Sequence, residues 1–212
     1  MKPNHRRKFI KQAITGSLVG LWGSQVLAQT QLVTPRQPEG PFYPITPQAD
    51  KDADLTRVAG KSGTAQGEII QVYGQVTDQN QRPIKGATLD IWQANSFGKY
   101  HHPHDDSEAP IDEHFQAWAI LKSGHNGQFS FKTVLPGAYP LGAKNQRTPH
   151  IHMKIGKHGY VPLLTQMYFP DHPLNARDGL YTRHTMEERA MLTAKRTAQK
   201  DTYQFDIVLE GY

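Results

Sequence analysis

The sequence predicts an all-β protein, an antiparallel β-sandwich with an extended N-terminal arm and one short C-terminal helix. Short segments that alternate apolar and polar residues recur from residue 67 onwards, and a period of two is the pattern of a half-buried strand. Gly- and Pro-rich turns separate these segments, and a single stretch shows helix signals. The 212 residues suit one domain with a substantial core.

Residues 1–28 have the layout of a twin-arginine export signal. Arg6 and Arg7 precede a modest apolar run, and a small-residue cleavage site ends at Ala28. The run is too short and too rich in Gly and Ser for a membrane-spanning helix, whereas Sec export would use the same features. We expect a mature periplasmic chain that begins near Gln29 and has no membrane span.

The formal charge of +5 comes from this first segment. Five of the 24 basic residues lie within 1–28, which contains no acidic residue, so the rest of the chain has 19 basic and 19 acidic residues. A neutral mature chain has no electrostatic support for binding nucleic acid. The chain contains no cysteine, which fits an oxidising compartment and a fold without disulfides.

Residues 29–66 are rich in Pro, Gln, Thr and Asp and show little periodicity, which predicts an extended arm. Its EGPFYP sequence is expected to dock on the core, where packing is the simplest role for Phe42 and Tyr43. The sandwich is predicted to span 67–212. Its strands are expected within segments 68–78, 87–95, 114–124, 128–136, 150–156, 161–170 and 202–211.

Local signals also predict a tight turn and a helix. The HNGQ sequence places a turn at Asn126-Gly127. A helix is expected from Met186 to Gln199, because Thr185 and Glu188 have the spacing of a capping box. Its weak apolar stripe is typical of a packing face rather than a binding site.

The HIHMKI sequence places two histidines in one predicted strand. Side chains at i and i+2 leave the same face about 7 Å apart, so His150 and His152 can bind one metal ion, although the pair alone also fits two half-exposed histidines. With Tyr100 and Tyr139 they would form an imidazole and oxygen site. A phenol with a usual pKa of about 10 binds strongly only to an acidic metal, and Fe(III) is the common biological candidate. Zinc more often recruits Cys, His or carboxylate.

Four blocks, in order, resemble the intradiol ring-cleavage dioxygenases, and most closely the β-subunit branch of the protocatechuate 3,4-dioxygenases: GATLDIWQANSFGKY, GQFSFKTVLPGAYP, RTPHIHMKI and LLTQMYFPDHP. The resemblance extends from about Glu39 to the C-terminus. It implies that Tyr100, Tyr139, His150 and His152 bind Fe(III). The implied reaction uses O2 to cleave a catechol-type ring between its two hydroxylated carbons, which gives a cis,cis-muconate.

Other residues receive roles only through this resemblance. Arg147 matches an arginine that stabilises developing charge on the substrate, where a surface cation is the simpler interpretation. Tyr139 would also accept a substrate proton, and Gln166 matches a glutamine near the O2 and substrate pocket. Tyr43 would be a substrate contact at the mouth of the site. The implied partners are a small aromatic diol, O2, and a second copy or a partner subunit.

Three alternative interpretations fit parts of the sequence. The HHPHD sequence could form a second metal site, but a solvated loop explains it more simply, with a hydrogen bond behind the metal ligands as a role for His102. A non-catalytic binding module of the transthyretin or carboxypeptidase-regulatory kind shares the first two blocks but has no need of the His-x-His pair. A metal-dependent hydrolase predicts a carboxylate ligand, and the motif set contains none. Trp92 and Trp118 are expected in the core.

Two positions depart from the resembling sequences. Arg147-Thr148-Pro149-His150 replaces the commoner order Arg-Pro-Ala-His, which moves proline next to a predicted ligand. Lys99 stands where arginine is common. The first change is expected to alter the shape of the loop but not the identity of the ligands.

Overall fold

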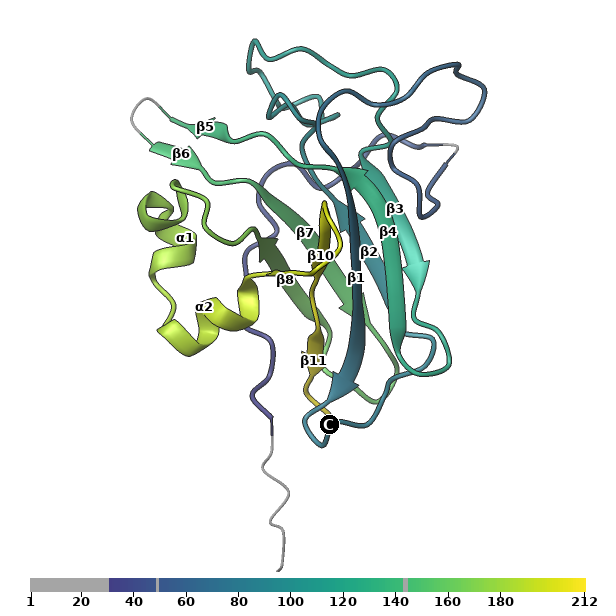
Figure 1. Ribbon diagram of the computed structural model, residues 1–212, viewed down its shortest axis with the longest axis vertical. Coiled ribbons are helices and arrows are strands. Elements are labelled where there is room, and N and C mark those ends of the chain that lie inside the picture. Colours follow the sequence, from purple (N-terminus) through teal and green to yellow (C-terminus); the bar gives the residue numbers. More distant parts are fainter. Residues whose placement is uncertain (1–30, 49, 143–144) are drawn as a thin grey trace, which may run out of the picture.

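Two β-sheets face each other in the computed structural model, which describes residues 31–48, 50–142 and 145–212 (Figure 1). One sheet has the strand order β11-β1-β10-β9, with β4 paired to β1, and the other has the order β3-β2-β7-β8. Strands β5 and β6 form a separate hairpin. The strands are β1 (Ile69–Asp78), β2 (Thr88–Trp92), β3 (Trp118–Lys122), β4 (Gln128–Val134), β5 (Tyr139–Leu141), β6 (Asn145–Arg147), β7 (His150–Gly156), β8 (Leu163–Tyr168), β9 (Lys195–Arg196), β10 (Thr202–Gln204) and β11 (Ile207–Leu209). The helical elements are η1 (Asn175–Arg177), α1 (Gly179–Thr182) and α2 (Met186–Leu192).

The core lies between the two sheets and follows the alternation in the sequence. Every second residue of β1 is buried, as expected for a strand with one face on the core. Strands β2 and β7 contribute their own alternate residues from the opposite sheet. The buried side chains include Ile70, Val72, Val76, Leu89, Ile91, Phe131, Ile151, Met153 and Ile155.

The predicted strand segments all contain strands, but the pairing is not wholly antiparallel. Strand β1 pairs in parallel with β10 and with β11, whereas its partner β4 and all pairs in the second sheet are antiparallel. The chain reaches β10 only after it has crossed through α1 and α2, and such a crossover is what parallel pairing requires. Phe205 and Asp206 divide the predicted C-terminal strand into two.

The predicted C-terminal helix is shorter than expected and is not alone. Its capping box is present, because Glu188 N donates to Thr185 Oγ1 and Thr185 N donates to Glu188 Oε2. The helix ends at Leu192 rather than Gln199, because Thr193 is extended and bridges to β8, and the next residues join the first sheet as β9. Sheet pairing therefore overrides helix propensity here. Helix α1 was not predicted from the sequence.

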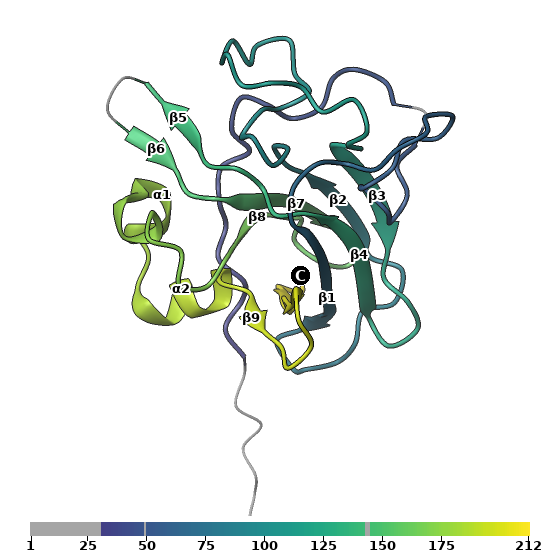
Figure 2. The same ribbon diagram turned by 45° about the horizontal axis from the view of Figure 1, so that its top comes forward.

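The N-terminal arm lies along β8 (Figure 2). Gln37 N donates to Leu164 O at 2.8 Å, and the side chains of Thr165 and Gln166 donate to the carbonyls of Pro35 and Pro38, each at 2.8 Å. The arm thus runs beside β8, which forms one edge of the second sheet. The predicted export signal lies outside the described residues. Within the described ranges, no helix is long and apolar enough to cross a membrane.

The layered core makes a testable prediction. Ile91 is fully buried between the sheets, whereas Ile120 on the neighbouring strand is 39% exposed. We expect Ile91→Ala to lower the free energy of unfolding by about 2–5 kcal/mol through lost burial and a residual cavity. Ile120→Ala should cost less than about 1 kcal/mol. Urea unfolding of both variants measures the difference, and equal costs would contradict the position of the core.

Candidate metal centre

Strand β7 presents His150 and His152 on the face of the sheet opposite to the core. Ile151 and Met153, the alternate residues, lie in the core cluster, so the two histidines must project from the other face. Both are nonetheless 2% exposed. The cross-strand register pairs His152 with Trp92 on β2 and with Gln166 on β8. The Trp92 ring stacks on His152 with centroids 4.8 Å apart and planes 6° apart.

The two imidazoles face each other through their Nε2 atoms, which lie 3.1 Å apart. His150 Nδ1 lies 2.7 Å from the carbonyl of Thr148, which can only accept, so Nδ1 holds the proton and Nε2 has the free lone pair. Burial and then Arg147 lower the pKa of His150 well below its usual value, and burial, His150 and Arg147 do the same for His152. Both rings are therefore neutral, which is the form that binds metals.

The β5–β6 hairpin brings Tyr139 and Arg147 to the same place. These residues are direct partners in the hairpin register. Arg147 Nη1 donates to Tyr139 Oη at 3.3 Å, and both side chains are buried. This hairpin is not among the predicted strands, although Gly142 between its strands, with a φ of +66°, is a turn signal.

Tyr100 reaches the site from the long loop after β2, which side chains hold in shape. Asn95 Oδ1 accepts from the backbone of Phe97 and Lys99, and Asp105 Oδ2 accepts from Tyr100 N at 2.7 Å. The Lys99 ammonium donates to the carbonyl and the carboxylate of Asp105. Lys99, which stands where arginine is common in the resembling sequences, therefore stabilises the shape of this loop.

Two glycines allow the Tyr100 loop to lie directly against the chain that leads into Tyr139. Gly98 has a φ of +82°, and a Cβ added there would lie 2.3 Å from the carbonyl oxygen of Ala138. A Cβ added at Gly137 would lie 2.3 Å from Gly98 N. Such distances exclude any side chain. Each glycine precedes a predicted tyrosine ligand by two residues, so this backbone contact sets the separation of the two tyrosines.

The four predicted ligand rings form a closed circuit of neighbours. Their centroids are 5.4 Å apart for Tyr100 and Tyr139, 5.6 Å for Tyr139 and His150, 4.8 Å for His150 and His152, and 6.1 Å for His152 and Tyr100. The structure thus brings together all four residues, which come from three separate parts of the chain.

Tyr100 supplies a test of whether this cluster suits a metal ion. Among the described residues, its buried Oη makes no hydrogen bond of acceptable geometry, and such an atom is costly unless something else binds it. Burial, and then the neighbouring Tyr139, raise the pKa of Tyr100 well above its usual value, and burial raises that of Tyr139 against the opposing effect of Arg147. The donors are two phenols and two neutral imidazoles, and this set fits Fe(III).

A cluster of His, Cys, Asp and Glu residues would indicate another type of metal site. No group of three or more such residues that could hold a metal ion occurs in the described part of the chain. His102 Nδ1 accepts from His104 N at 3.1 Å, and its ring packs on Phe42. The HHPHD sequence therefore forms a local turn, and the hydrogen bond from His102 to the ligand shell is not among its contacts.

Arg147 lies buried beside the cluster and is not a surface cation. Its Nη2 donates to Gln166 Oε1 at 2.6 Å and to Tyr168 Oη at 3.3 Å, while its Nε donates to Asp178 Oδ2 at 2.8 Å. Burial alone would lower the pKa of Arg147, but Tyr139, Tyr168 and Asp178 raise it. The guanidinium is therefore a permanent cation. Sequence reasoning missed Asp178, which lies in no motif.

The aromatic residues of the arm cover the site. Phe42 packs against Tyr100 with centroids 4.8 Å apart. Tyr43 lies over β2 on the same outer face of the sheet, where its hydroxyl donates to Asp90 Oδ2 at 2.7 Å, and burial and this hydrogen bond raise the pKa of Tyr43 to about 12. Its ring contacts Trp92 and Trp118 edge-on. Of the two, Phe42 is the residue next to the predicted ligands.

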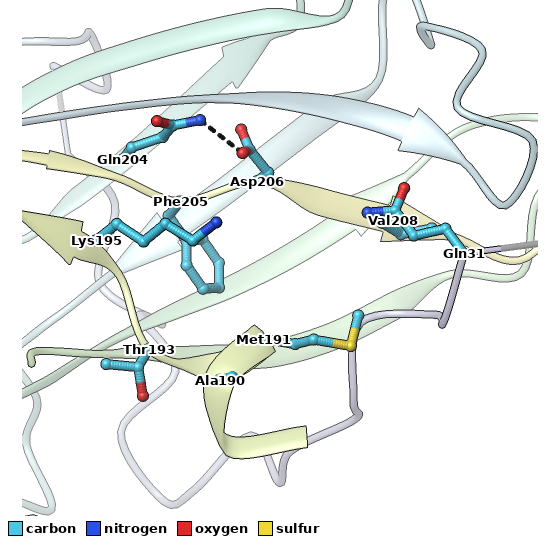
Figure 3. A pocket seen from close by; sticks show the side chains of 9 residues that line it. All are labelled: Gln31, Ala190, Met191, Thr193, Lys195, Gln204, Phe205, Asp206 and Val208. Carbon is cyan, nitrogen blue, oxygen red and sulfur yellow. Dashed lines mark hydrogen bonds between the residues drawn. The ribbon is translucent and has the colours of Figure 1, made fainter. Parts of the chain in front are cut away.

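A separate hollow of about 230 Å³ lies between α2 and strands β9 to β11 (Figure 3). Lys195 and Asp206 supply its charged groups, and Gln204 donates to Asp206 on the same wall. None of the four predicted ligand residues lines it. This hollow is therefore distinct from the ring cluster.

Comparison with known proteins finds dioxygenases both by sequence and by fold. A family model described as Dioxygenase matches residues 38–211. The chain is 35% identical to the protocatechuate 3,4-dioxygenase beta chain of Burkholderia cepacia, over 83% of this chain and 79% of that protein. It is 27% identical to catechol 1,2-dioxygenase 2 of Acinetobacter lwoffii, over 78% of this chain and 63% of that protein.

Solved structures give the same result. The dioxygenase domain of a dioxygenase carbohydrate-binding protein fusion from Streptomyces sp. SirexAA-E superposes with a TM-score of 0.64 at 30% identity, over 85% of this chain and 99% of that chain. The 3-chlorocatechol 1,2-dioxygenase of Rhodococcus opacus 1CP superposes with a TM-score of 0.65 at 20% identity, over 87% of this chain and 76% of that chain, which supports the fold alone.

The close approach at Gly98 makes a testable prediction with a matched control. Gly60 also has a positive φ, of +77°, but no atom lies within 4 Å of a Cβ added there. Gly60→Ala should therefore cost only the backbone strain of about 1–2 kcal/mol. Gly98→Ala should cost about 1–3 kcal/mol more, because the added methyl group meets a backbone carbonyl. Urea unfolding compares them, and equal losses would show that the Tyr100 loop and the segment before Tyr139 can move apart freely.

Proposed function

The chain belongs to the intradiol ring-cleavage dioxygenase family, and on this premise we propose that it binds Fe(III) through Tyr100, Tyr139, His150 and His152. The observation that carries the proposal is the closed circuit of these four buried rings, with His150 Nε2 and His152 Nε2 turned toward each other and Tyr100 Oη without a described hydrogen-bond partner. Fe(III) would supply the Lewis acidity that binds both oxygens of a catechol and makes its ring reactive toward O2.

The chain's own residues prepare the substrate for this chemistry. Tyr139, with its oxygen next to Arg147 Nη1, would lose its proton on binding Fe(III), and the resulting tyrosinate would be placed to accept a proton from a catechol hydroxyl. Arg147 presents its terminal nitrogens toward the cluster from a buried position, where a fixed cation stabilises negative charge that develops on the ring. Gln166 holds Arg147 Nη2 and at the same time anchors the arm at Pro38.

The substrate that we propose is a small aromatic diol of the catechol or protocatechuate type, which is cleaved by O2 between its hydroxylated carbons to a cis,cis-muconate. Phe42, in contact with Tyr100, would exclude water and pack on the aromatic ring. Tyr43, whose ring contacts Trp92 edge-on, would be a more distant substrate contact at the mouth of the site. A second copy of the chain or a partner subunit would complete the pocket, since the relative at 35% identity is a beta chain.

The visible spectrum tests this function directly. The purified protein, reconstituted with iron, should show a broad charge-transfer band from tyrosinate to Fe(III). Catechol added under argon should shift the band to longer wavelength, and admission of air should restore it while muconate absorbance appears. A protein that stays colourless with iron would overturn the metal site and support the non-catalytic binding module.

Tyrosine variants give the matching controls. Tyr100→Phe and Tyr139→Phe should each weaken or abolish the band, because each removes one phenolate donor. Tyr73→Phe, on β1 and 38% exposed, should leave the band unchanged. Catechol, protocatechuate and hydroxyquinol, compared as substrates by kcat/KM, would then define the class of ring that is accepted.

We further propose export to the periplasm by the twin-arginine route. This route carries folded proteins, so the metal would be loaded before export. The full chain with Arg6→Lys and Arg7→Lys together should remain in the cytoplasm as the longer precursor, whereas the unchanged chain should be found in the periplasm. Cell fractionation with immunoblotting measures both, and undiminished export of the double variant would support the Sec route instead.

A further inference from the structure

Asp178 is a buried carboxylate whose contacts connect the active-site arginine to a helix. It is 1% exposed and accepts hydrogen bonds from two segments of the chain, the end of β6 and the start of α1. Its Oδ2 accepts from Arg147 Nε at 2.8 Å and from Thr148 N at 3.1 Å. Its Oδ1 accepts from Leu180 N at 2.9 Å and from Tyr181 N at 3.3 Å, which caps α1.

The contact with Arg147 fixes the direction of the guanidinium. Asp178 takes the Nε edge, so Nη1 and Nη2 are left to face Tyr139, Gln166 and Tyr168. A planar guanidinium held along one edge can rotate very little about its long side chain. The orientation of the cation in the site therefore depends on a residue that does not itself reach the four rings.

The contact with Thr148 extends the same control to a predicted metal ligand. The carbonyl of Thr148 accepts from His150 Nδ1 at 2.7 Å and so turns Nε2 toward the cluster. Thr148 Oγ1 donates to Asn175 Oδ1 at 2.7 Å and lies 3.1 Å from His172 Nδ1. A proline at this position would have neither an N–H for Asp178 nor a hydroxyl for Asn175. In this chain Thr148 is thus held by the hydrogen bonds that it donates to Asn175 and Asp178 of the η1–α1 segment.

We propose that Asp178 is a positioning residue of this dioxygenase: from the N-cap of α1 it orients Arg147 toward the reacting ring and fixes the Thr148 peptide that aligns His150. The proposal rests on the proposed function. It assigns to the η1–α1 segment a role in the reaction, although that segment contributes no ligand.

The test is Asp178→Asn in the iron-loaded protein. Asn caps helices as well as Asp does, so the α1 side of the contact is kept. An amide that keeps its oxygen toward α1 would place NH2 against Arg147 Nε and Thr148 N, donor against donor. We expect kcat to fall about 10-fold to 100-fold, KM for catechol to change less than about threefold, and the tyrosinate band to remain. Asp178→Ser, which also caps α1 but is too short to reach Arg147, should behave in the same way.

A double-mutant cycle separates positioning from a general loss of stability. If Asp178 acts mainly through Arg147, then Asp178→Asn should lower kcat far less in an Arg147→Gln background than in the wild type. Multiplicative effects of the two substitutions would overturn the proposal. So would an unchanged kcat in Asp178→Asn and Asp178→Ser while the wild type is coloured and active. A colourless, inactive wild type would instead overturn the proposed function.

Asp78→Asn is the matched control. Asp78 is 4% exposed, accepts from Asn80 N and Arg82 N and binds Arg82 Nε at 2.7 Å, but it is the last residue of β1. Its loss should lower the thermal unfolding midpoint without altering kcat, KM or the band. A fall in kcat equal to that of Asp178→Asn would assign the effect to stability and contradict the proposal.

Discussion

The two-residue period of strand β7 is the constraint on which the rest of the site depends. Ile151, Met153 and Ile155 are buried between the sheets, and their burial fixes the register of the strand, because a slip by one residue would expose all three. The same register sends His150 and His152 to the outer face. The hydrophobic core thus determines the placement of the candidate metal ligands. The arm and the Tyr100 loop then bury a face that would otherwise meet solvent.

The other two rings reach that face through contacts between distant parts of the chain. Tyr139 is positioned by a hairpin that pairs it with Arg147, and Tyr100 by a loop that lies against the chain before Tyr139 at Gly98 and Gly137. The site is therefore built on one rigid strand and on two loops that hold each other. Such loops can differ among proteins of one fold while the strand stays the same.

Local patterns in the sequence predicted much of this molecule. Alternation identified the strand segments, the capping box of α2 is present, and the His-x-His spacing identified two of the clustered rings. What could not be predicted depends on partners far apart in the chain. The parallel pairing of β1 with β10 and β11, the end of the helix at Leu192, and the carboxylate of Asp178 all follow from tertiary contacts. A lone Asp before a four-residue helix has no spacing that would connect it with an arginine 31 residues earlier.

The charges around the cluster explain why a buried ion pair is found there. Arg147 and Asp178 are 4% and 1% exposed, and burial of such a pair often gives no net stability relative to well-packed apolar side chains. Here the penalty is reduced because Asp178 accepts four hydrogen bonds, three of them from backbone N–H groups. The two imidazoles and two phenols beside the pair are neutral without a metal. The Arg147 cation lies next to these neutral donors, and its carboxylate partner Asp178 lies on the side away from them. Such an arrangement is suited to stabilise negative charge that arrives with a substrate. The ion pair is therefore explained by the chemistry of the site rather than by the stability of the fold.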